Sequence, residues 1–108
     1  MTEFADLTKM AKIEVVIDGA DEATVRDLML GAGASGYTAV TGVSGFGHRG
    51  AHQGRLLFND KASLSMLISV VPLDRADTLV AGIRQLLEHQ HGVLFVTETY
   101  VSRPGYFT

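Results

Sequence analysis

The hydrophobic pattern of this chain changes period in a fixed order, and that order limits the folds available to it. Residues 10–17 alternate apolar and polar side chains, which is the two-residue period of a strand. Residues 20–31 place apolar side chains at helical spacing, with Asp18 or Asp21 suited to cap the first turn and with glycines following. Residues 37–43 are rich in Tyr, Thr and Val, which favours a second strand.

The second half repeats this order after an irregular stretch. Residues 64–71 predict a third strand, which Pro72 ends. Asp74 suits the N-cap of a helix with a continuous apolar stripe, and Gly92 suits the C′ position beyond that helix. Residues 93–101 predict a fourth strand. One face of the third strand is fully apolar and consists of Leu64, Met66, Ile68 and Val70.

The resulting order, β-α-β-β-α-β, is that of an α+β, ferredoxin-like sandwich with a long loop after the second strand. The 108 residues are enough for one core, so we expect a single domain over residues 1–108. Two helices cover only one face of a four-stranded sheet. The opposite face, called the open face below, is expected to be covered by further copies of the chain. The apolar side chains expected there are Val16, Val40, Leu67, Val71, Val96 and Tyr100.

Composition excludes several functional classes. There is no apolar run of about 20 residues and no signal-peptide pattern, so we expect no membrane insertion. The chain has no cysteine, which excludes thiol chemistry and fits a cytoplasmic location. The formal net charge of −3 argues against a nucleic-acid partner.

The loop that begins at Ser44 and ends at Ser63 is the segment best suited to hold an anion. Eight of the 12 glycines lie between Gly31 and Gly54, where backbone N–H groups can approach phosphate oxygens closely. The surrounding stretch, residues 28–59, contains no Asp or Glu. A G-x-G-x-x-G pattern is present, but no helix pattern follows it, which excludes a Rossmann site. The charge-assisted donors of the loop are His48, Arg49, His52 and Arg55.

The residues give little support to catalysis or metal binding. The histidines lack a His-Glu-x-x-His spacing and an obvious third ligand, and no serine has a Gly-x-Ser-x-Gly setting. The turn at residues 18–22 is acidic, which does not suit acylphosphatase chemistry. We therefore expect no catalytic residue and no metal. The alternative that stays open is a small ferredoxin-like enzyme, of acylphosphatase or phosphohydrolase type, or a metal-tolerance trimer.

Three segments together resemble the PII signal-transduction superfamily: residues 33–38 leading into 45–50, the strand 64–71, and residues 91–96 leading to 103–107. The chain is most similar to the PII-like proteins linked to inorganic carbon, which are associated with bicarbonate transporters or carboxysomes. The resemblance implies a non-enzymatic homotrimer that binds ADP, AMP, ATP or cyclic AMP between subunits, with no cofactor. It also implies bicarbonate as a co-effector in the control of inorganic-carbon metabolism. The loop from Ser44 to Ser63 then corresponds to the T-loop, which contacts a target protein.

The resemblance also assigns binding residues. The nucleotide-binding positions that it implies are Gly42, Gly45, Gly47, His48, Arg49, Gly92, Val93 and Arg103. For the small anion, the resemblance and the donors of the loop together indicate Gly47, Arg49 and Arg55.

The chain also departs from the classical nitrogen-regulatory members. Arg49 and Val93 stand where those members carry a Gln and a Lys, which argues against 2-oxoglutarate sensing. No Tyr lies between Ser44 and Ser63, so uridylylation of the loop is not expected.

Overall fold

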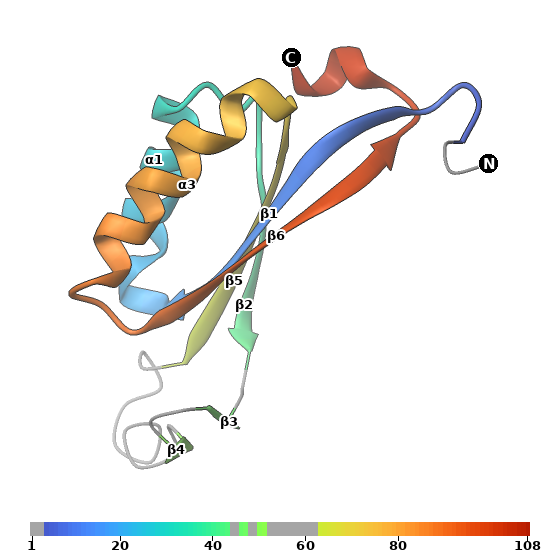
Figure 1. Cartoon of the computed structure of the whole chain (residues 1–108). Helices are drawn as coiled ribbons and strands as arrows, with labels where there is room; N and C mark the ends of the chain where they lie inside the picture. The colour runs from blue at the N-terminus through green and yellow to red at the C-terminus, as the bar shows by residue number, and fades with distance from the viewer. Residues whose placement is uncertain (1–3, 44–45, 48–49, 52–62) are drawn as a thin grey trace.

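The computed structural model describes residues 4–43, 46–47, 50–51 and 63–108, and Figure 1 shows their arrangement. In these residues the architecture is α+β, with a four-stranded antiparallel sheet and two α-helices, as the sequence predicts. The segment expected to be irregular contains a short hairpin of β3 and β4. In chain order the elements are β1 (Thr8–Asp18), η1 (Gly19–Asp21), α1 (Glu22–Gly31), β2 (Thr38–Val43), β3 (Phe46–Gly47), β4 (Gly50–Ala51), β5 (Leu64–Val71), α3 (Leu73–Leu87), β6 (Gly92–Val101) and η3 (Pro104–Phe107).

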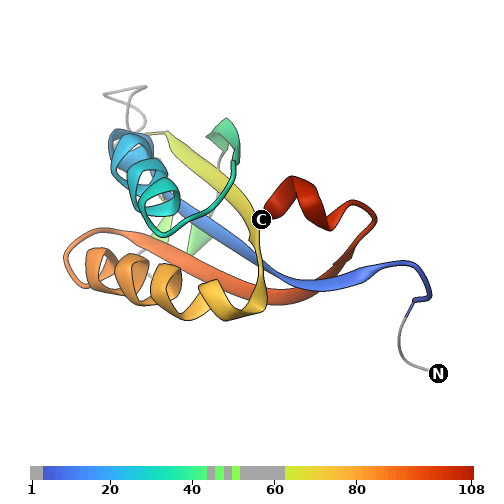
Figure 2. The ribbon, with the colours of Figure 1, turned by 90° about the horizontal axis from the view of Figure 1, so that it is seen from above.

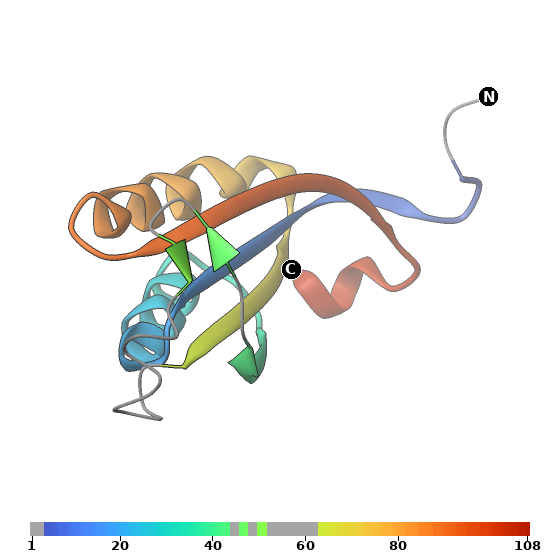
Figure 3. The same cartoon turned by 90° about the horizontal axis from the view of Figure 1, so that it is seen from below.

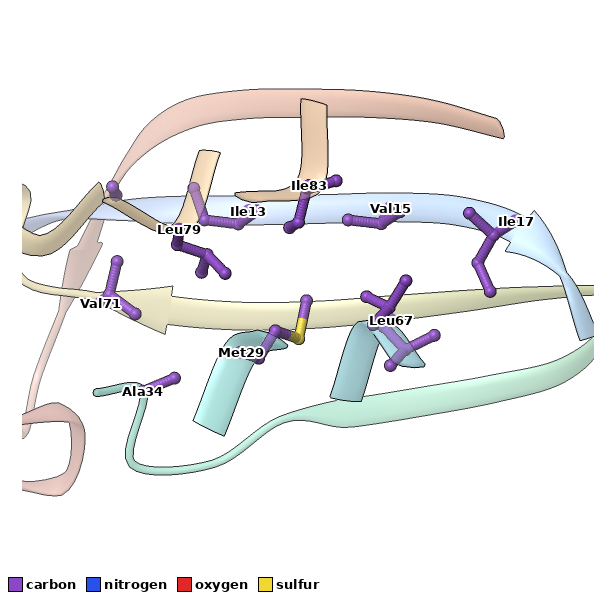
Figure 4. Packing of buried hydrophobic residues seen from close by; sticks show 11 residues of the cluster. Ile13, Val15, Ile17, Met29, Ala34, Leu67, Val71, Leu79 and Ile83 are labelled. Carbon is purple, nitrogen blue, oxygen red and sulfur yellow. The ribbon is translucent and has the colours of Figure 1, made fainter. Parts of the chain in front are cut away.

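The strands lie in the order β2-β5-β1-β6, so β1 and β5 are central and every pair is antiparallel. Helices α1 and α3 lie side by side on one face of the sheet (Figures 1 and 2). The alternation predicted for the first strand is confirmed, because its apolar positions point into the core between sheet and helices. Figure 4 shows this core, which consists of Ala11, Ile13, Val15, Ile17, Val25, Met29, Ala34, Leu67, Val71, Leu79 and Ile83.

The prediction for the open face is wrong on β5 and on β6. Leu67 and Val71 pair with core residues of β1 and are buried beneath the helices. Val96 and Tyr100 share the helix side of β6, because they alternate in step with Leu94, which packs against the core. Only Val16 and Val40 lie on the open face as expected.

The error has a physical cause in two serines. Ser65 and Ser69 are each only 2% exposed and face the helices, although serine usually lies at a surface. Their hydroxyls are satisfied: Ser65 Oγ donates to Glu22 Oε1 at 2.9 Å, and Ser69 Oγ donates to the Gly36 carbonyl at 2.8 Å. The fully apolar side of β5 is therefore turned outward, with Met66, Ile68 and Val70 half-buried on the open face.

An unbroken apolar row consequently crosses the open face. The register pairs Val40 with Met66, Met66 with Val16, and Val16 with Val93, so one apolar side chain comes from each strand. Val40 and Val93 are 43% and 49% exposed, and neighbouring Phe95 is 53% exposed. No element among the described residues covers this row, which leaves an apolar band across the whole sheet.

The ends of the helices agree only in part with the sequence expectation. Gly33, with φ +94°, ends α1 in a Schellman motif, in which Ala34 N–H donates to the Met29 carbonyl and Gly33 N–H to that of Leu30. Asp18 and Asp21 precede η1 and α1, but neither makes a side-chain capping hydrogen bond.

Among the described residues, no helix is long and apolar enough to cross a membrane.

The two predictions for the ends of α3 are wrong. Pro72, which is extended, occupies the N-cap, so Asp74 lies inside the first turn. The C-cap is Glu88, and Gly92 lies beyond it as the first residue of β6 rather than at C′. The last turn closes instead through His89 N–H and Gln90 N–H, which both donate to the Leu86 carbonyl.

Candidate functional site

The candidate residues lie at two opposite ends of the sheet. At the first end, called the loop end, β2 finishes, β6 begins, and the β3–β4 hairpin lies in front of the sheet in Figure 3. At the second end, called the tail end, β6 finishes and the chain runs into η3 (Figure 1). Gly42, Gly47, Gly92 and Val93 belong to the loop end, and Arg103 belongs to the tail end.

Gly42 and Gly92 lie on opposite edges of the loop end. Thr41, next to Gly42, pairs with Ser65, which pairs with Ile17, which pairs with Gly92. Three strand spacings therefore separate the two edges, or roughly 14 Å at about 4.8 Å each. Gly42 has φ +73° at an irregularity in the β2–β5 pairing, so a side chain there would be strained.

Gly92 has a packing role that is independent of any ligand. A Cβ at this position would lie 2.6 Å from Ile17 Cγ2, 2.8 Å from Leu87 Cδ2 and 2.8 Å from the Val16 carbonyl oxygen. The backbone oxygen cannot move without disturbing β1. Glycine is thus required here for β6 to lie against β1 beneath the end of α3.

We expect Gly92→Ala to lower the free energy of unfolding by about 1–3 kcal/mol, because it overpacks the junction of β1, β6 and α3. The matched control is Gly82→Ala in α3, where a Cβ would meet Leu28 Cδ2 at an ordinary 3.4 Å. That variant is expected to gain up to about 1 kcal/mol of helix propensity. Urea unfolding of both variants measures the difference, and equal stabilities would contradict the packing role of Gly92.

The base of the long loop is fixed on both sides. Val43 pairs with Leu64 across β2 and β5, and Gly19 N–H donates to the Ser63 carbonyl at 2.8 Å. Nearby, His91 Nδ1 lies 3.9 Å from Asp18 Oδ2, with both side chains partly buried. The sequence did not predict this contact, although both residues stand at the ends of predicted elements. These contacts place Val43 and Ser63, the residues that flank the loop, at the same end of the sheet as Gly42 and the start of β6.

Several predicted site residues fall on the loop itself. Gly47 lies in β3 and pairs with Gly50 of β4. Gly45, His48, Arg49 and Arg55 lie outside the described residues, so their roles in binding stay predictions. Val93 is described and projects from the open face beside Val16, where it forms the β6 edge of the apolar row.

At the tail end, Arg103 is held by a residue that the sequence did not assign to the site. Arg103 Nη1 donates to the Tyr106 hydroxyl at 2.9 Å, and its guanidinium carbon lies 5.4 Å from the centre of the Tyr106 ring. Ser35 Oγ, from the loop between α1 and β2, donates to the Tyr106 carbonyl at 2.7 Å. These three residues bring together segments that are 71 positions apart in the chain.

The two ends of the sheet are too far apart to form one site within one chain. The 10 residues of β6 separate Gly92 from the tail end, which makes roughly 30 Å at about 3.3 Å per residue. An adenine nucleotide is much shorter than this strand. Gly92 and Arg103 can therefore contact one nucleotide only if the loop end of one chain meets the tail end of another.

The described side chains present no metal centre. No group of three or more His, Asp or Glu residues in the described part of the chain is arranged to hold a metal ion. What the described site residues present is a glycine-lined loop end and an exposed guanidinium at the tail end. This arrangement suits the binding of an anionic ligand through backbone N–H groups and a charged donor.

Comparisons with known proteins agree with this geometry. The family model described as nitrogen regulatory protein P-II matches residues 10–106. A comparison with curated protein sequences gave no match.

Solved structures are similar over nearly the whole chain. CPII from Thiomonas intermedia K12, a nitrogen regulatory PII-like protein bound to ADP, AMP and bicarbonate, is 37% identical with a TM-score of 0.84, covering 94% of this chain and 95% of that one. The same protein bound to ADP, AMP and acetate gives 34% identity and a TM-score of 0.78, covering 94% and 96%. A PII-like signalling protein from Thermus thermophilus shares the fold at 19% identity and a TM-score of 0.78, covering 95% and 99%.

Proposed function

Because this chain belongs to the nitrogen regulatory P-II family, within the PII-like subgroup that includes CPII, we propose that it is a single-domain regulator that binds ADP, AMP or a related adenine nucleotide. Proteins of this family are signalling proteins and generally not enzymes. We extend that to this chain. The observation that carries the proposal is the similarity, over nearly the whole chain, to a protein solved with ADP, AMP and bicarbonate.

We propose that the nucleotide lies between two subunits. The separation of about 30 Å between Gly92 and the tail end supports this, because a single chain cannot bring both groups to one ligand. Arg103 of one subunit then donates to the phosphates. The loop end of the neighbouring subunit contributes Gly42, Gly45, Gly47, His48, Arg49, Gly92 and Val93.

We propose that the assembly is a homotrimer. Family members are typically homotrimers that contact target proteins. The apolar row of Val40, Met66, Val16 and Val93 supports the same state for this chain. Covering such a face contributes about 25 cal/mol for each Å² removed from water. The trimer would therefore both bury this row and create the sites between subunits.

We propose bicarbonate as the second effector, bound by Gly47, Arg49 and Arg55. The acid-free stretch of residues 28–59 supports an anion in this region, because no carboxylate of that stretch opposes it. Bicarbonate and acetate are both small planar oxyanions, and both occur in CPII structures. The same donors can therefore serve either anion.

The regulatory role follows from these ligands. We propose that the protein senses adenine nucleotides together with bicarbonate and controls inorganic-carbon metabolism in the cytoplasm, where both ligands are available. The loop from Ser44 to Ser63 would contact the target, which we expect to be a bicarbonate transporter or a carboxysome-associated protein. The fixed base of this loop, at Val43 with Leu64 and at Gly19 with Ser63, supports a link between binding and target contact.

Isothermal titration calorimetry with ADP, AMP, ATP and cyclic AMP tests the proposed function. In a parallel assay, the protein is incubated with each nucleotide and, separately, with acyl phosphates, and the release of phosphate is measured. The proposal expects saturable binding of at least one nucleotide without turnover. Absence of binding by all four would contradict it, and phosphate release in repeated turnovers would favour a ferredoxin-like enzyme instead.

A further inference from the structure

The C-terminal helix η3 is hydrogen-bonded to a part of the chain that is distant in sequence. Ser35 Oγ donates to the Tyr106 carbonyl at 2.7 Å, and Tyr106 N–H donates to the Arg103 carbonyl at 3.0 Å. As Figure 2 shows, η3 therefore turns back after β6 instead of continuing the strand direction. Ser35 fixes the turn of the chain from which the Arg103 side chain projects.

Helix η3, positioned by this hydrogen bond, in turn orients the Arg103 side chain through Tyr106. The Tyr106 hydroxyl accepts from Arg103 Nη1 at 2.9 Å, and the ring lies 5.4 Å from the guanidinium carbon. Tyr106 is itself 66% exposed, so packing against the core does not fix the position of its ring. A free arginine side chain loses much rotamer entropy when it binds a ligand. A guanidinium that is already oriented loses less.

Ser35 can act as an anchor because its own loop is held from both sides. Arg75 Nη1 donates to the Gly33 carbonyl at 3.0 Å, and Ser69 Oγ donates to the Gly36 carbonyl at 2.8 Å. The Schellman motif at Gly33 fixes the loop to the end of α1. The hydroxyl of Ser35 is thus presented from a rigid segment, although the residue itself is exposed.

We propose that Ser35 is a positioning residue for phosphate recognition. Its hydrogen bond docks η3, the docked Tyr106 orients Arg103, and the oriented guanidinium meets the nucleotide phosphates. This inference rests on the proposed function, because it requires Arg103 to face a phosphate. Ser35 is not expected to touch the ligand itself.

The test compares the dissociation constants of ADP and adenosine in four proteins: wild type, Ser35→Ala, Ser35→Thr and Ser69→Ala. Loss of one neutral hydrogen bond lowers the docked population of η3, so Ser35→Ala should weaken ADP by about three- to tenfold. Adenosine, which has no phosphate, should change by less than about twofold. Ser35→Thr keeps the hydroxyl and should restore ADP affinity.

Ser69→Ala is the matched control. It also removes a serine hydroxyl that donates to a carbonyl of the same loop, but the Ser69 hydrogen bond goes to Gly36 rather than to η3. Because Ser69 supports the segment that carries Ser35 but makes no hydrogen bond to η3, its selective effect on ADP should be clearly smaller than that of Ser35→Ala. If Ser69→Ala reproduces the selective loss of ADP, general loosening of the loop explains the effect and the positioning role is overturned.

A double-mutant cycle and a spectrum of the ligand-free protein complete the test. In an Arg103→Ala background, Ser35→Ala should cause no further loss of ADP affinity, because the group that it positions is gone. The Tyr106 ring is expected to shift the Nε–Hε resonance of Arg103 in the wild type, and this resonance should move in Ser35→Ala without ligand. Additive losses, or an unmoved resonance, would overturn the inference. Failure of the wild type to bind ADP would instead overturn the proposed function, and this inference with it.

Discussion

Met66→Asp is expected to convert the assembly into monomers that still fold. Met66 stands in the apolar row of the open face with Val40 on one side and Val16 on the other. In the proposed homotrimer this row would be buried, and an unpaired carboxylate there would cost about 3–5 kcal/mol per subunit. In the isolated chain position 66 remains partly in contact with water, so folding should survive. Sedimentation velocity at micromolar protein measures the change.

The control for this prediction is Thr78→Asp, which places the same charge on the exposed side of α3. Thr78→Asp and the conservative Met66→Leu should both sediment as trimers. Far-ultraviolet circular dichroism of Met66→Asp should match that of the wild type. A monomeric wild type would contradict both the trimer and the placement of the nucleotide between subunits.

Arg103→Ala is expected to weaken ADP binding by about 10- to 150-fold, which corresponds to about 1.5–3 kcal/mol for hydrogen bonds to a charged group. The guanidinium is exposed and oriented by Tyr106, so its removal takes away a donor that is ready for phosphate. Adenosine lacks that phosphate and should lose little affinity. Calorimetric titration with both ligands separates the two effects.

Arg84→Ala serves as the control for charge, because Arg84 is another exposed arginine, in the last turn of α3. It removes the same charge from α3, a helix to which the proposed site assigns no residue. ADP affinity should stay within about twofold of the wild type. Equal losses of ADP and adenosine in Arg103→Ala would mean that Arg103 acts through folding of η3 rather than on phosphate.

The order of elements could be predicted because the periodicities are long and unambiguous. The alternation of β1 favours a strand and the stripe of α3 favours a helix, and both form as predicted; Gly33 marks the end of α1 as expected. The orientation of β5 could not be predicted. Its buried serines are satisfied by Glu22 and by the Gly36 carbonyl, and nothing in the local sequence reveals such distant partners.

The candidate site was predictable to a smaller extent. The family resemblance pointed to Gly92 as a nucleotide residue, whereas the structure also gives it a packing role against Ile17 and Leu87. The contact of Ser35 with Tyr106 joins segments far apart in the chain, so no periodicity or spacing indicates it. The sequence placed Arg103 in the site but could not show what holds it.

The central claim is that an adenine nucleotide and bicarbonate bind this protein together. It is tested most directly by calorimetric titration of ADP in bicarbonate and in chloride at the same pH and ionic strength. The glycine-rich loop is costly to order, so a first ligand that holds it removes part of that cost for the second. We predict that bicarbonate tightens ADP by about 5- to 150-fold in the wild type, and by much less in Arg49→Ala. An ADP affinity that is the same in bicarbonate and chloride, or no binding of ADP in either, would contradict the account.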